Sequence, residues 1–378
     1  MTTAIEPFQV AVTSSAIGDL RERLNRARWP EPATVTDWSQ GVPLGYLQDL
    51  CRYWRDDYDW TARQDRLNSF PQYRAEIDGL GVHFIHVPSP HPGALPLILT
   101  HGWPGSVVEF LEVIPALVDP TLEGGDPADA FHVVVPSLPG YGFTDRPAET
   151  GWGIERTARA WAELMSRLGY RRYGAQGGDW GSMVTTSIGQ QDPGHVAGIH
   201  LNMVLGFPGP DDGEMTEMEQ SAMARVQDYN EWDSGYMKQQ GTRPQTLGYG
   251  LVDSPVGQCA WILEKFWSWS DTDGDPVGAL GADRILDNVM LYWLTATGAS
   301  SARMYWESIR NPPFGPVSVP MGASVFPKEI FRCSRRWAER QFADIRYWGE
   351  PEVGGHFAAF EQPAIFVEEL RRFFATVR

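Results

Sequence analysis

The 378-residue sequence is poor in cysteine and in basic residues. Its three cysteines, Cys51, Cys259 and Cys333, lie far apart and form no CxxC pair, so neither a disulfide framework nor a zinc site is supported. Lysine and arginine number 31 against 48 acidic residues, which gives a formal net charge of −17 at pH 7. This charge has the wrong sign for phosphate backbones or anionic lipid, so neither nucleic acid nor a membrane is an expected partner.

The sequence also has no long apolar run. The N-terminus MTTAIEPFQV lacks a basic segment followed by an apolar one, and no stretch approaches the roughly 20 apolar residues that span a bilayer. Together with the scarcity of cysteine, this predicts a soluble, cytoplasmic protein. No metal is expected either. The segment DTDGD at 271–275 resembles a calcium loop, but its glycine comes too early and Ala282 replaces the closing glutamate, so an acidic turn is favoured.

What the chain does have is the composition of a globular protein, with 42% hydrophobic and 21% charged residues. Apolar spacing over residues 16–27 predicts an N-terminal helix. The segment from there to about residue 73 is rich in Trp, Pro and Arg and is expected to be a helical or irregular extension. Strand-like apolar runs, typical of a buried parallel sheet, follow at 79–87, 96–102, 131–140, 171–179, 195–204 and 321–327.

Helical patterns interrupt these strands twice. Apolar residues recur every three or four positions over 151–168, which predicts a crossover helix. From about 206 to 311 the strand rhythm disappears, and we expect a helical lid over the carboxyl ends of the strands, where open α/β sheets bind ligands. The predicted organisation is an extension (1–75), a first core segment (76–205), the lid (206–311) and a second core segment (312–378).

The sharpest local motif is QGGDWGS at 176–182, where a strand runs into a turn of small residues and then a helix. It has the form of a nucleophile elbow, in which Gly177 and Gly181 flank Asp179 and permit a sharp turn with close helix packing. An aspartate that only caps the following helix is the alternative. Ser182 lies outside the elbow, which argues against a serine esterase.

A second motif, LTHGWPGS at 99–106, leaves a strand into a loop. In the α/β-hydrolase fold such a loop supplies one backbone N–H of an oxyanion hole, and the residue after the nucleophile supplies the other. These donors are predicted to be Trp103 and Trp180. The loop itself is shaped by the motif residues His101, Gly102 and Pro104.

A histidine and an acid complete the candidate set. His356 lies in GGHFAAFE, after the elbow and after an acidic residue, and the order nucleophile, acid, histidine is the one this fold uses. That order outweighs the structural role that a lone loop histidine more often has. For the acid we favour Glu329, directly after the strand at 321–327. Asp344 is the competitor, but it stands at the start of the predicted last strand, away from the ligand-binding edge.

Together these segments resemble the microsomal-type epoxide hydrolases of the α/β-hydrolase superfamily. The resemblance spans nearly the whole chain and rests on RWPEP, RYWRDDYDW, HGWPGS, PSLPGYGFTDRP, GGDWGS, FPKE and GGHFAAFEQP. HGxP and GGDWG are each moderately specific, whereas their combination with GGHFAAFE and the extension is highly specific. The resemblance implies an α/β-hydrolase fold with a mostly parallel central sheet, a helical lid and the N-terminal extension.

The resemblance also implies residue roles. Asp179 would be the nucleophile, Glu329 and His356 would complete its triad, and the lid tyrosines Tyr236 and Tyr305 would bind the epoxide oxygen. The implied reaction converts an epoxide and water into a vicinal diol through an ester on Asp179, with no metal or organic cofactor.

Two rival functions are weighed against this hypothesis. A haloalkane dehalogenase also has an aspartate in a D-W-G elbow, with the Trp180 indole as halide donor, but it needs no ring-opening tyrosines and normally lacks the extension. A catalytically inactive fold acting as a binding or scaffold protein is the second rival. It is disfavoured because nucleophile, acid, base and oxyanion segment are all present.

The sixteen tryptophans bear on the substrate. Those of the lid are expected to form aromatic walls around a small, apolar, aromatic or bulky epoxide, and those of the extension are expected to pack it. The lid group comprises Trp232, Trp261, Trp267, Trp269, Trp293 and Trp306, and the extension group includes Trp29, Trp38, Trp54 and Trp60. The sequence leaves open whether the substrate is a xenobiotic or a natural-product epoxide such as that of an enediyne pathway. It also leaves open whether the chain forms a homodimer.

Overall fold

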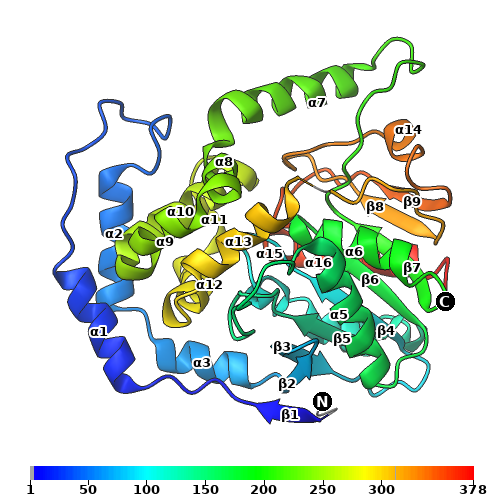
Figure 1. The fold of residues 1–378 in the computed structure, drawn as a ribbon, viewed down its shortest axis with the longest axis horizontal. Coiled ribbons are helices and arrows are strands. Elements are labelled where there is room, and N and C mark those ends of the chain that lie inside the picture. Colours follow the sequence, from blue (N-terminus) through cyan, green and yellow to red (C-terminus); the bar gives the residue numbers. More distant parts are fainter. Residues whose placement is uncertain (1–3, 311) are drawn as a thin grey trace.

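A nine-stranded β-sheet forms the centre of the structure, a computed structural model that describes residues 4–310 and 312–378 (Figure 1). The strand order is β1-β2-β3-β5-β4-β6-β7-β8-β9. Pairings among β1, β2, β3 and β5 are antiparallel, and those from β5 to β9 are parallel. The strands are β1 (Ile5–Phe8), β2 (Gln72–Ile77), β3 (Leu80–Val87), β4 (Leu95–Thr100), β5 (Phe131–Pro136), β6 (Tyr173–Gly177), β7 (Val196–Leu201), β8 (Met321–Ser324) and β9 (Ile345–Gly349). The predicted, mostly parallel sheet is confirmed.

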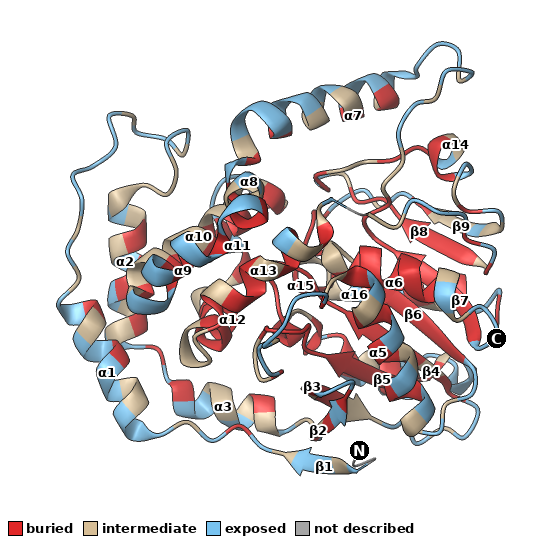
Figure 2. Ribbon diagram, in the orientation of Figure 1, coloured by how far each residue is buried: buried red, intermediate tan, exposed pale blue. Residues whose placement is uncertain are grey.

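Helices cover both faces of this sheet, and β4 to β8 are almost wholly buried between them (Figure 2). A Cβ on Gly174 of β6 would meet the Phe374 ring of α16 (Pro363–Phe374), whereas a Cβ on Gly177 would meet Gly181 of α6 (Trp180–Gln191). Because positions three apart on a strand point to opposite faces, α6 and α16 lie on opposite sides of the sheet. The shorter core helices are η1 (Val107–Phe110), α4 (Ile114–Val118), η2 (Pro120–Glu123), η3 (Pro127–Asp129), α14 (Arg335–Ala338) and α15 (Ala358–Glu361).

The predicted crossover helix is also present, as α5 (Ile154–Arg167) between β5 and β6. Its buried side chains include Trp161, Leu164 and Met165, which follow the helical spacing seen in the sequence. Each of the six predicted strand segments likewise overlaps one of the strands β3 to β8, and β4 begins one residue before its predicted segment. Long apolar segments with a regular period were therefore predicted correctly.

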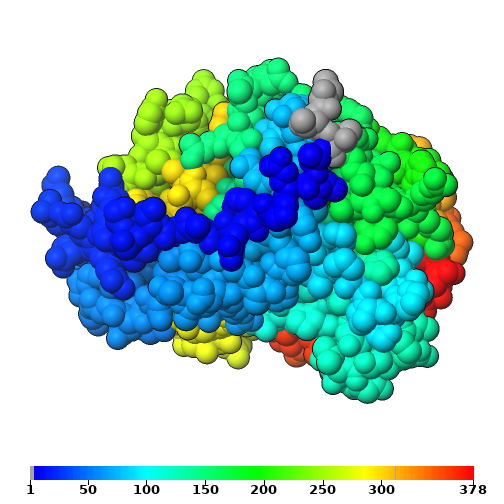
Figure 3. All heavy atoms as spheres, turned by 90° about the horizontal axis from the view of Figure 1, so that it is seen from below, coloured from blue at the N-terminus to red at the C-terminus, as the bar shows by residue number. Residues whose placement is uncertain are grey.

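The N-terminal extension runs across the outside of the molecule as a continuous band (Figure 3). It contains α1 (Ser14–Asn25), which confirms the predicted helix, α2 (Leu44–Asp56) and α3 (Trp60–Asn68). The expectation that strands begin only after it was wrong, because β1 pairs antiparallel with β2 at the edge of the sheet. The four residues of β1 include Pro7 and show no alternation, so their strand conformation depends on the edge that β2 offers.

The insertion between β7 and β8 is helical, as predicted for the lid, with residue 311 outside the described part of the chain. Ser300 on α13 donates a hydrogen bond to the carbonyl of Gly140, after β5, and Asn288 on α12 donates one to Pro104, after β4. The lid therefore covers the carboxyl ends of the strands. Its helices are α7 (Glu217–Asp228), η4 (Tyr229–Asp233), α8 (Gly235–Thr242), α9 (Pro244–Asp253), α10 (Pro255–Trp269), α11 (Pro276–Leu280), α12 (Ala282–Leu294) and α13 (Gly298–Ser308).

Candidate active site

Asp179 stands at the sharp turn between β6 and α6. Its backbone adopts φ 51° and ψ −127°, a region that non-glycine residues rarely occupy. A Cβ on Gly177 would lie 2.0 Å from the carbonyl oxygen of Gly181, and a Cβ on Gly181 would lie 1.9 Å from that of Thr100. Both glycines are therefore needed for close backbone approach. The Asp179 side chain makes no capping hydrogen bond to α6, so the helix-cap alternative is not what the structure has.

His356 lies between two carboxylates. Its Nδ1 is 2.8 Å from Oε1 of Glu329, and its Nε2 is 3.4 Å from Oδ2 of Asp179. Glu329 is fully buried, and its Oε1 also accepts a hydrogen bond from the backbone N–H of Ile330 at 2.6 Å. Burial lowers the pKa of His356, but the carboxylates of Glu329 and Asp179 outweigh burial and raise this pKa well above its ordinary value. The arrangement favours an imidazolium held between the two acids.

The competing acid, Asp344, lies elsewhere. It precedes β9 and forms an ion pair with Arg346 at 2.9 Å, with both side chains about 40% exposed. The structure thus brings Glu329, and not Asp344, to His356.

The loop after β4 brings a backbone donor to Asp179. The N–H of Trp103 donates to Oδ1 of Asp179 at 2.8 Å. A Cβ on Gly102 would lie 2.3 Å from the same oxygen, so the glycine leaves room for the carboxylate. Trp180 is the first residue of α6, where a backbone N–H has no acceptor within the helix. Both predicted oxyanion residues therefore adjoin the carboxyl group of Asp179.

His101 and Pro104 hold this loop in place. The buried His101 donates from Nδ1 to the carbonyl of Gly102 at 2.9 Å and accepts at Nε2 from the N–H of Leu138 at 3.2 Å. Burial lowers the pKa of His101 to about 4. The ring therefore stays neutral, with one nitrogen that donates a hydrogen bond and one that accepts. The carbonyl of Pro104 accepts a hydrogen bond from Nδ2 of Asn288 at 2.7 Å. Neither side chain contacts Asp179 with a polar atom, so their contribution is to the shape of the loop.

The two predicted lid tyrosines meet over the Trp103 indole. Tyr236, on α8, stacks on Trp103 with ring centroids 4.9 Å apart, and Tyr305, on α13, contacts Trp103 and Trp180 edge-on at 5.8 and 4.7 Å. The hydroxyl groups differ: that of Tyr236 lies 2.8 Å from the Tyr229 hydroxyl, whereas that of Tyr305 has no partner among the described residues. Burial and the nearby Asp179 raise the pKa of both phenols well above the usual value, so both remain protonated donors.

Four of the six lid tryptophans line a groove of about 740 Å³ that reaches Tyr236: Trp232, Trp261, Trp267 and Trp269. Trp269 also packs against His356, with ring centroids 5.0 Å apart. The expectation was wrong for Trp293 and Trp306, which do not line this groove. It was also incomplete for Trp38, because this extension residue stacks on Trp267 at 5.0 Å and forms part of the groove wall.

Two charged residues near the site were not predicted. Lys265, with a 3% exposed side chain, pairs with Asp233 at 2.6 Å and lies 4.6 Å from the centre of the Tyr236 ring. Glu109 lines a small cavity beside Asp179 and His356. Glu109 stands in the otherwise apolar run VVEFL, and Lys265 stands beside Glu264 within the apolar segment WILEKFW. Burying a charge in such a run is costly unless it is paired. That signal could have identified both from the sequence.

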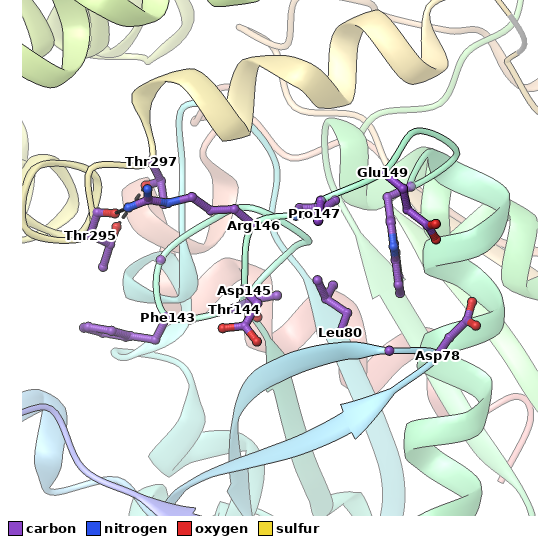
Figure 4. A pocket seen from close by; sticks show the side chains of 14 residues that line it. Asp78, Leu80, Phe143, Thr144, Asp145, Arg146, Pro147, Glu149, Thr295 and Thr297 are labelled. Atoms are coloured by element: carbon purple, nitrogen blue, oxygen red, sulfur yellow. Dashed lines mark hydrogen bonds between the residues drawn. The ribbon is translucent and has the colours of Figure 1, made fainter. Parts of the chain in front are cut away.

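A separate polar hollow of about 850 Å³ lies away from these residues (Figure 4). It opens between the β2–β3 turn at Asp78, the loop after β5, and the turn between α12 and α13. Arg146 crosses it to donate a hydrogen bond to the carbonyl of Thr295. None of the residues predicted for catalysis lines this hollow.

The described residues include no group of three or more His, Cys, Asp or Glu side chains that could hold a metal ion. The acidic segment at 271–275 has other contacts: Asp275 caps α11 and Asp271 accepts a hydrogen bond from Gly354. Within the same described part, no helix has both the length and the apolar character to cross a membrane.

Comparison with known proteins adds a second kind of observation. The family Epoxide hydrolase N terminus matches residues 5–110, and the family alpha/beta hydrolase fold matches residues 96–250. A protein of Stigmatella aurantiaca named "Putative epoxide hydrolase" is 56% identical over 376 residues, covering 99% of this chain and 86% of its own. Epoxide hydrolase 1 of Sus scrofa is 36% identical over 403 residues, covering 98% and 88%.

Solved structures agree in fold. The juvenile hormone epoxide hydrolase of the silkworm Bombyx mori superposes with a TM-score of 0.93 at 31% identity, over 100% of this chain and 95% of its own. The epoxide hydrolase of Aspergillus niger superposes with a TM-score of 0.89 at 32% identity, over 99% and 97%. The similarity thus includes the extension, the lid and the core.

Proposed function

This chain belongs to the microsomal-type epoxide hydrolases, which join the epoxide hydrolase N-terminal segment to an α/β-hydrolase core, and we propose that it opens its epoxide through an ester on Asp179. Membership of this family makes the chain an epoxide hydrolase. Our proposal concerns the reaction route, which passes through the ester on Asp179. One observation carries that route: His356 bridges Asp179, at a strained elbow, and the buried Glu329.

In the first step a carboxylate oxygen of Asp179 attacks a ring carbon of the epoxide. A carboxylate needs no base to remove a proton first, and the strain of the ring makes its carbon a good electrophile. The carbon–oxygen bond of the ring breaks, and its electron pair stays on the departing oxygen. Tyr236 and Tyr305 donate hydrogen bonds or a proton to that oxygen, which would otherwise leave as a strongly basic alkoxide.

In the second step water hydrolyses the ester. Esterification removes the negative charge of Asp179, one cause of the raised pKa of His356, so the ring can lose its proton and act as a base. Its Nε2 then takes a proton from the water, while Glu329 holds the tautomer and stabilises the imidazolium that forms. The water oxygen adds to the carboxyl carbon of Asp179, and the negative charge that develops there accepts hydrogen bonds from the N–H groups of Trp103 and Trp180. In comparable sites each such donor contributes about 3 kcal/mol.

Collapse of this intermediate breaks the bond to the alkyl-bearing oxygen, which leaves with the proton held by His356. The second proton of the water passes from the new carboxyl group to the tyrosine or alkoxide left without a proton in the first step, which restores the carboxylate and completes the diol.

The groove beside Tyr236 and Trp269 supports an apolar and bulky epoxide as substrate. Its volume of about 740 Å³ falls in the range of pockets that take drug-sized ligands, and aromatic side chains form much of its wall. Charged groups also line it, including the Lys265–Asp233 pair. Comparing diol formation from styrene-type, terminal and fused-ring epoxides tests this preference, and faster turnover of small terminal epoxides than of aromatic ones would contradict it.

The route is tested by two substitutions. Asp179→Ala removes the nucleophile, so diol formation should fall by about 10,000-fold or more. His356→Gln should still allow the ester to form but not to hydrolyse, so intact-protein mass spectrometry should show an adduct heavier by the mass of the epoxide. His195→Gln, at an exposed histidine paired with Asp192, is the matched control and should leave turnover unchanged. Diol formation at the normal rate by the alanine variant would falsify the route.

A further inference from the structure

A small cavity lies beside the proposed nucleophile. Its volume is about 10 Å³, close to the space that one water molecule needs. Several polar side chains line it, as a site for water requires: Thr100, Glu109, Asp179, Asn202 and His356. The hydroxyl of Thr100 is buried and has no hydrogen-bond partner within the described chain.

Glu109 is the member of this set that the proposed route does not use. It lies on η1, whose first turn Ser106 caps. The carboxyl group occupies the space beside Gly105, where a Cβ would lie 1.5 Å from Oε1 of Glu109. No side chain among residues 4–310 and 312–378 forms an ion pair or hydrogen bond with it, and the backbone of Ser106 is its hydrogen-bonding neighbour. Protein surrounds this side chain, yet part of its surface stays accessible, as expected where it faces a cavity.

The charges around Glu109 change during the proposed reaction. Burial raises its pKa to about 8, the carboxylates of Asp179 and Glu361 add to that effect, and His356 opposes it. Tyr292, the other titratable neighbour, is a neutral phenol. Esterification removes the negative charge of Asp179, which removes one cause of the raised pKa. The base role of His356 requires its neutral form, which removes the opposing effect as well. Holding a water does not depend on the charge of Glu109, because in either protonation state a carboxyl oxygen can accept a hydrogen bond from water.

We propose that this cavity holds the water that hydrolyses the ester, and that Glu109 is the positioning residue for it. The water donates one hydrogen bond to the Glu109 carboxylate and presents its other hydrogen to Nε2 of His356. Its oxygen bonds to the carboxyl carbon of Asp179, the bond from that carbon to the alkyl-bearing oxygen breaks, and the proton held by His356 passes to the departing diol oxygen. The second hydrogen of the water stays on the new carboxyl oxygen of Asp179 and then passes to the tyrosine or alkoxide left without a proton in the first step, so Glu109 ends with the protons it began with. This inference rests on the proposed ester route.

Rapid-mixing kinetics with styrene oxide separate the two steps. Glu109→Gln keeps the shape of the side chain but weakens the hydrogen bond that it accepts from the water. Ester formation should stay within about 2-fold of the unmodified enzyme, while ester hydrolysis should slow by about 10- to 100-fold, because misplacement of a reactant by about 1 Å has that effect. The ester should then accumulate at steady state, with kcat and KM falling together. Glu109→Asp, which restores the carboxylate, should recover part of the rate.

Glu112→Gln is the matched control, since Glu112 lies one turn further along, is exposed and pairs with Arg66. Both of its steps should be unchanged. An unchanged hydrolysis rate in both Glu109→Gln and Glu109→Leu would overturn the inference, and so would an equal loss in both steps. Absence of any ester in His356→Gln would overturn the proposed route instead, so the two failures are distinguishable.

Discussion

The hydroxyl groups of Tyr236 and Tyr305 have different neighbours although both rings flank Trp103. The Tyr236 hydroxyl can accept a hydrogen bond from Tyr229 while it donates to a substrate oxygen. The Tyr305 hydroxyl is buried with no partner in the described structure, a costly arrangement that a substrate oxygen would relieve. At the scale of single residues, the two phenols are therefore not equivalent donors.

This asymmetry predicts unequal effects of removing each hydroxyl. Tyr305→Phe and Tyr236→Phe should each slow ester formation, by about 100-fold for Tyr305, because general acid catalysis is typically worth that much or more. The effect at Tyr236 should be smaller, since Tyr229 can partly replace it. Single-turnover measurement of the ester gives both rates, with Tyr249→Phe, at an exposed tyrosine, as the control. Unchanged rates of ester formation in both variants would show that the tyrosines do not donate to the epoxide oxygen.

At the scale of secondary-structure elements, α12 connects the N-terminal extension to the loop after β4. On its outer side, Asp287 accepts a hydrogen bond from the hydroxyl of Tyr58 at 2.8 Å and pairs with Arg63 of α3. On its inner side, the neighbouring Asn288 binds Pro104, and Tyr292 donates to the carbonyl of Gly105 at 2.7 Å. The extension thereby supports the loop that carries Trp103, in addition to the contribution of Trp38 to the groove wall.

Breaking the outer connection should therefore destabilise the fold. Arg63→Gln leaves Asp287, whose side chain is only 10% exposed, without its cation. Loss of one partner from such a pair costs about 3 kcal/mol of the free energy of unfolding. Arg66→Gln on the same helix removes an exposed pair with Glu112 and should cost less than about 1 kcal/mol. Urea unfolding of both variants measures the two free energies of unfolding. Equal decreases would contradict the proposed role of the Arg63–Asp287 pair.

At the scale of the whole molecule, the sheet buries titratable groups whose charge state differs from that in the unfolded chain. His200, on the inner strand β7, is fully buried, and its Nε2 lies 3.0 Å from the Ser324 hydroxyl on β8. Burial lowers the pKa of His200 to about 3. In the unfolded chain the same group has a pKa near 6.5, so it takes up a proton there first.

Its contribution to stability must therefore decline as the pH falls from about 6.5 toward 3. The unfolded state binds the extra proton in this window, which costs the folded state about 1.4 kcal/mol per pH unit. His200→Asn keeps a hydrogen-bonding group but cannot be protonated. Between pH 7 and pH 5, the stability advantage of the unmodified enzyme over this variant should shrink by about 2 kcal/mol in urea unfolding. If the free energies of unfolding of the two proteins change in parallel with pH, His200 does not contribute to the pH dependence in this way.

Local motifs explain why much of the fold and site was predictable. The turn at Asp179 needs small residues at Gly177 and Gly181, and the structure shows backbone atoms about 2 Å from where their Cβ atoms would be. The buried strands correspond to short apolar runs, and α5 to apolar residues spaced three or four positions apart, so both are visible in the local sequence. By contrast, β1 has four residues and a proline, and only the edge of β2 makes it a strand.

By itself the sequence determined the family, the fold class, the helical lid, and the positions of Asp179 and His356 in their motifs, because each depends on residues close together in the chain or on motif order. Only the tertiary structure decided which acid reaches His356, which lid tryptophans face the groove, and that Glu109 lies beside Asp179. These depend on contacts between segments tens to hundreds of residues apart. No local period encodes such contacts, since packing of the lid, the extension and the loops sets them.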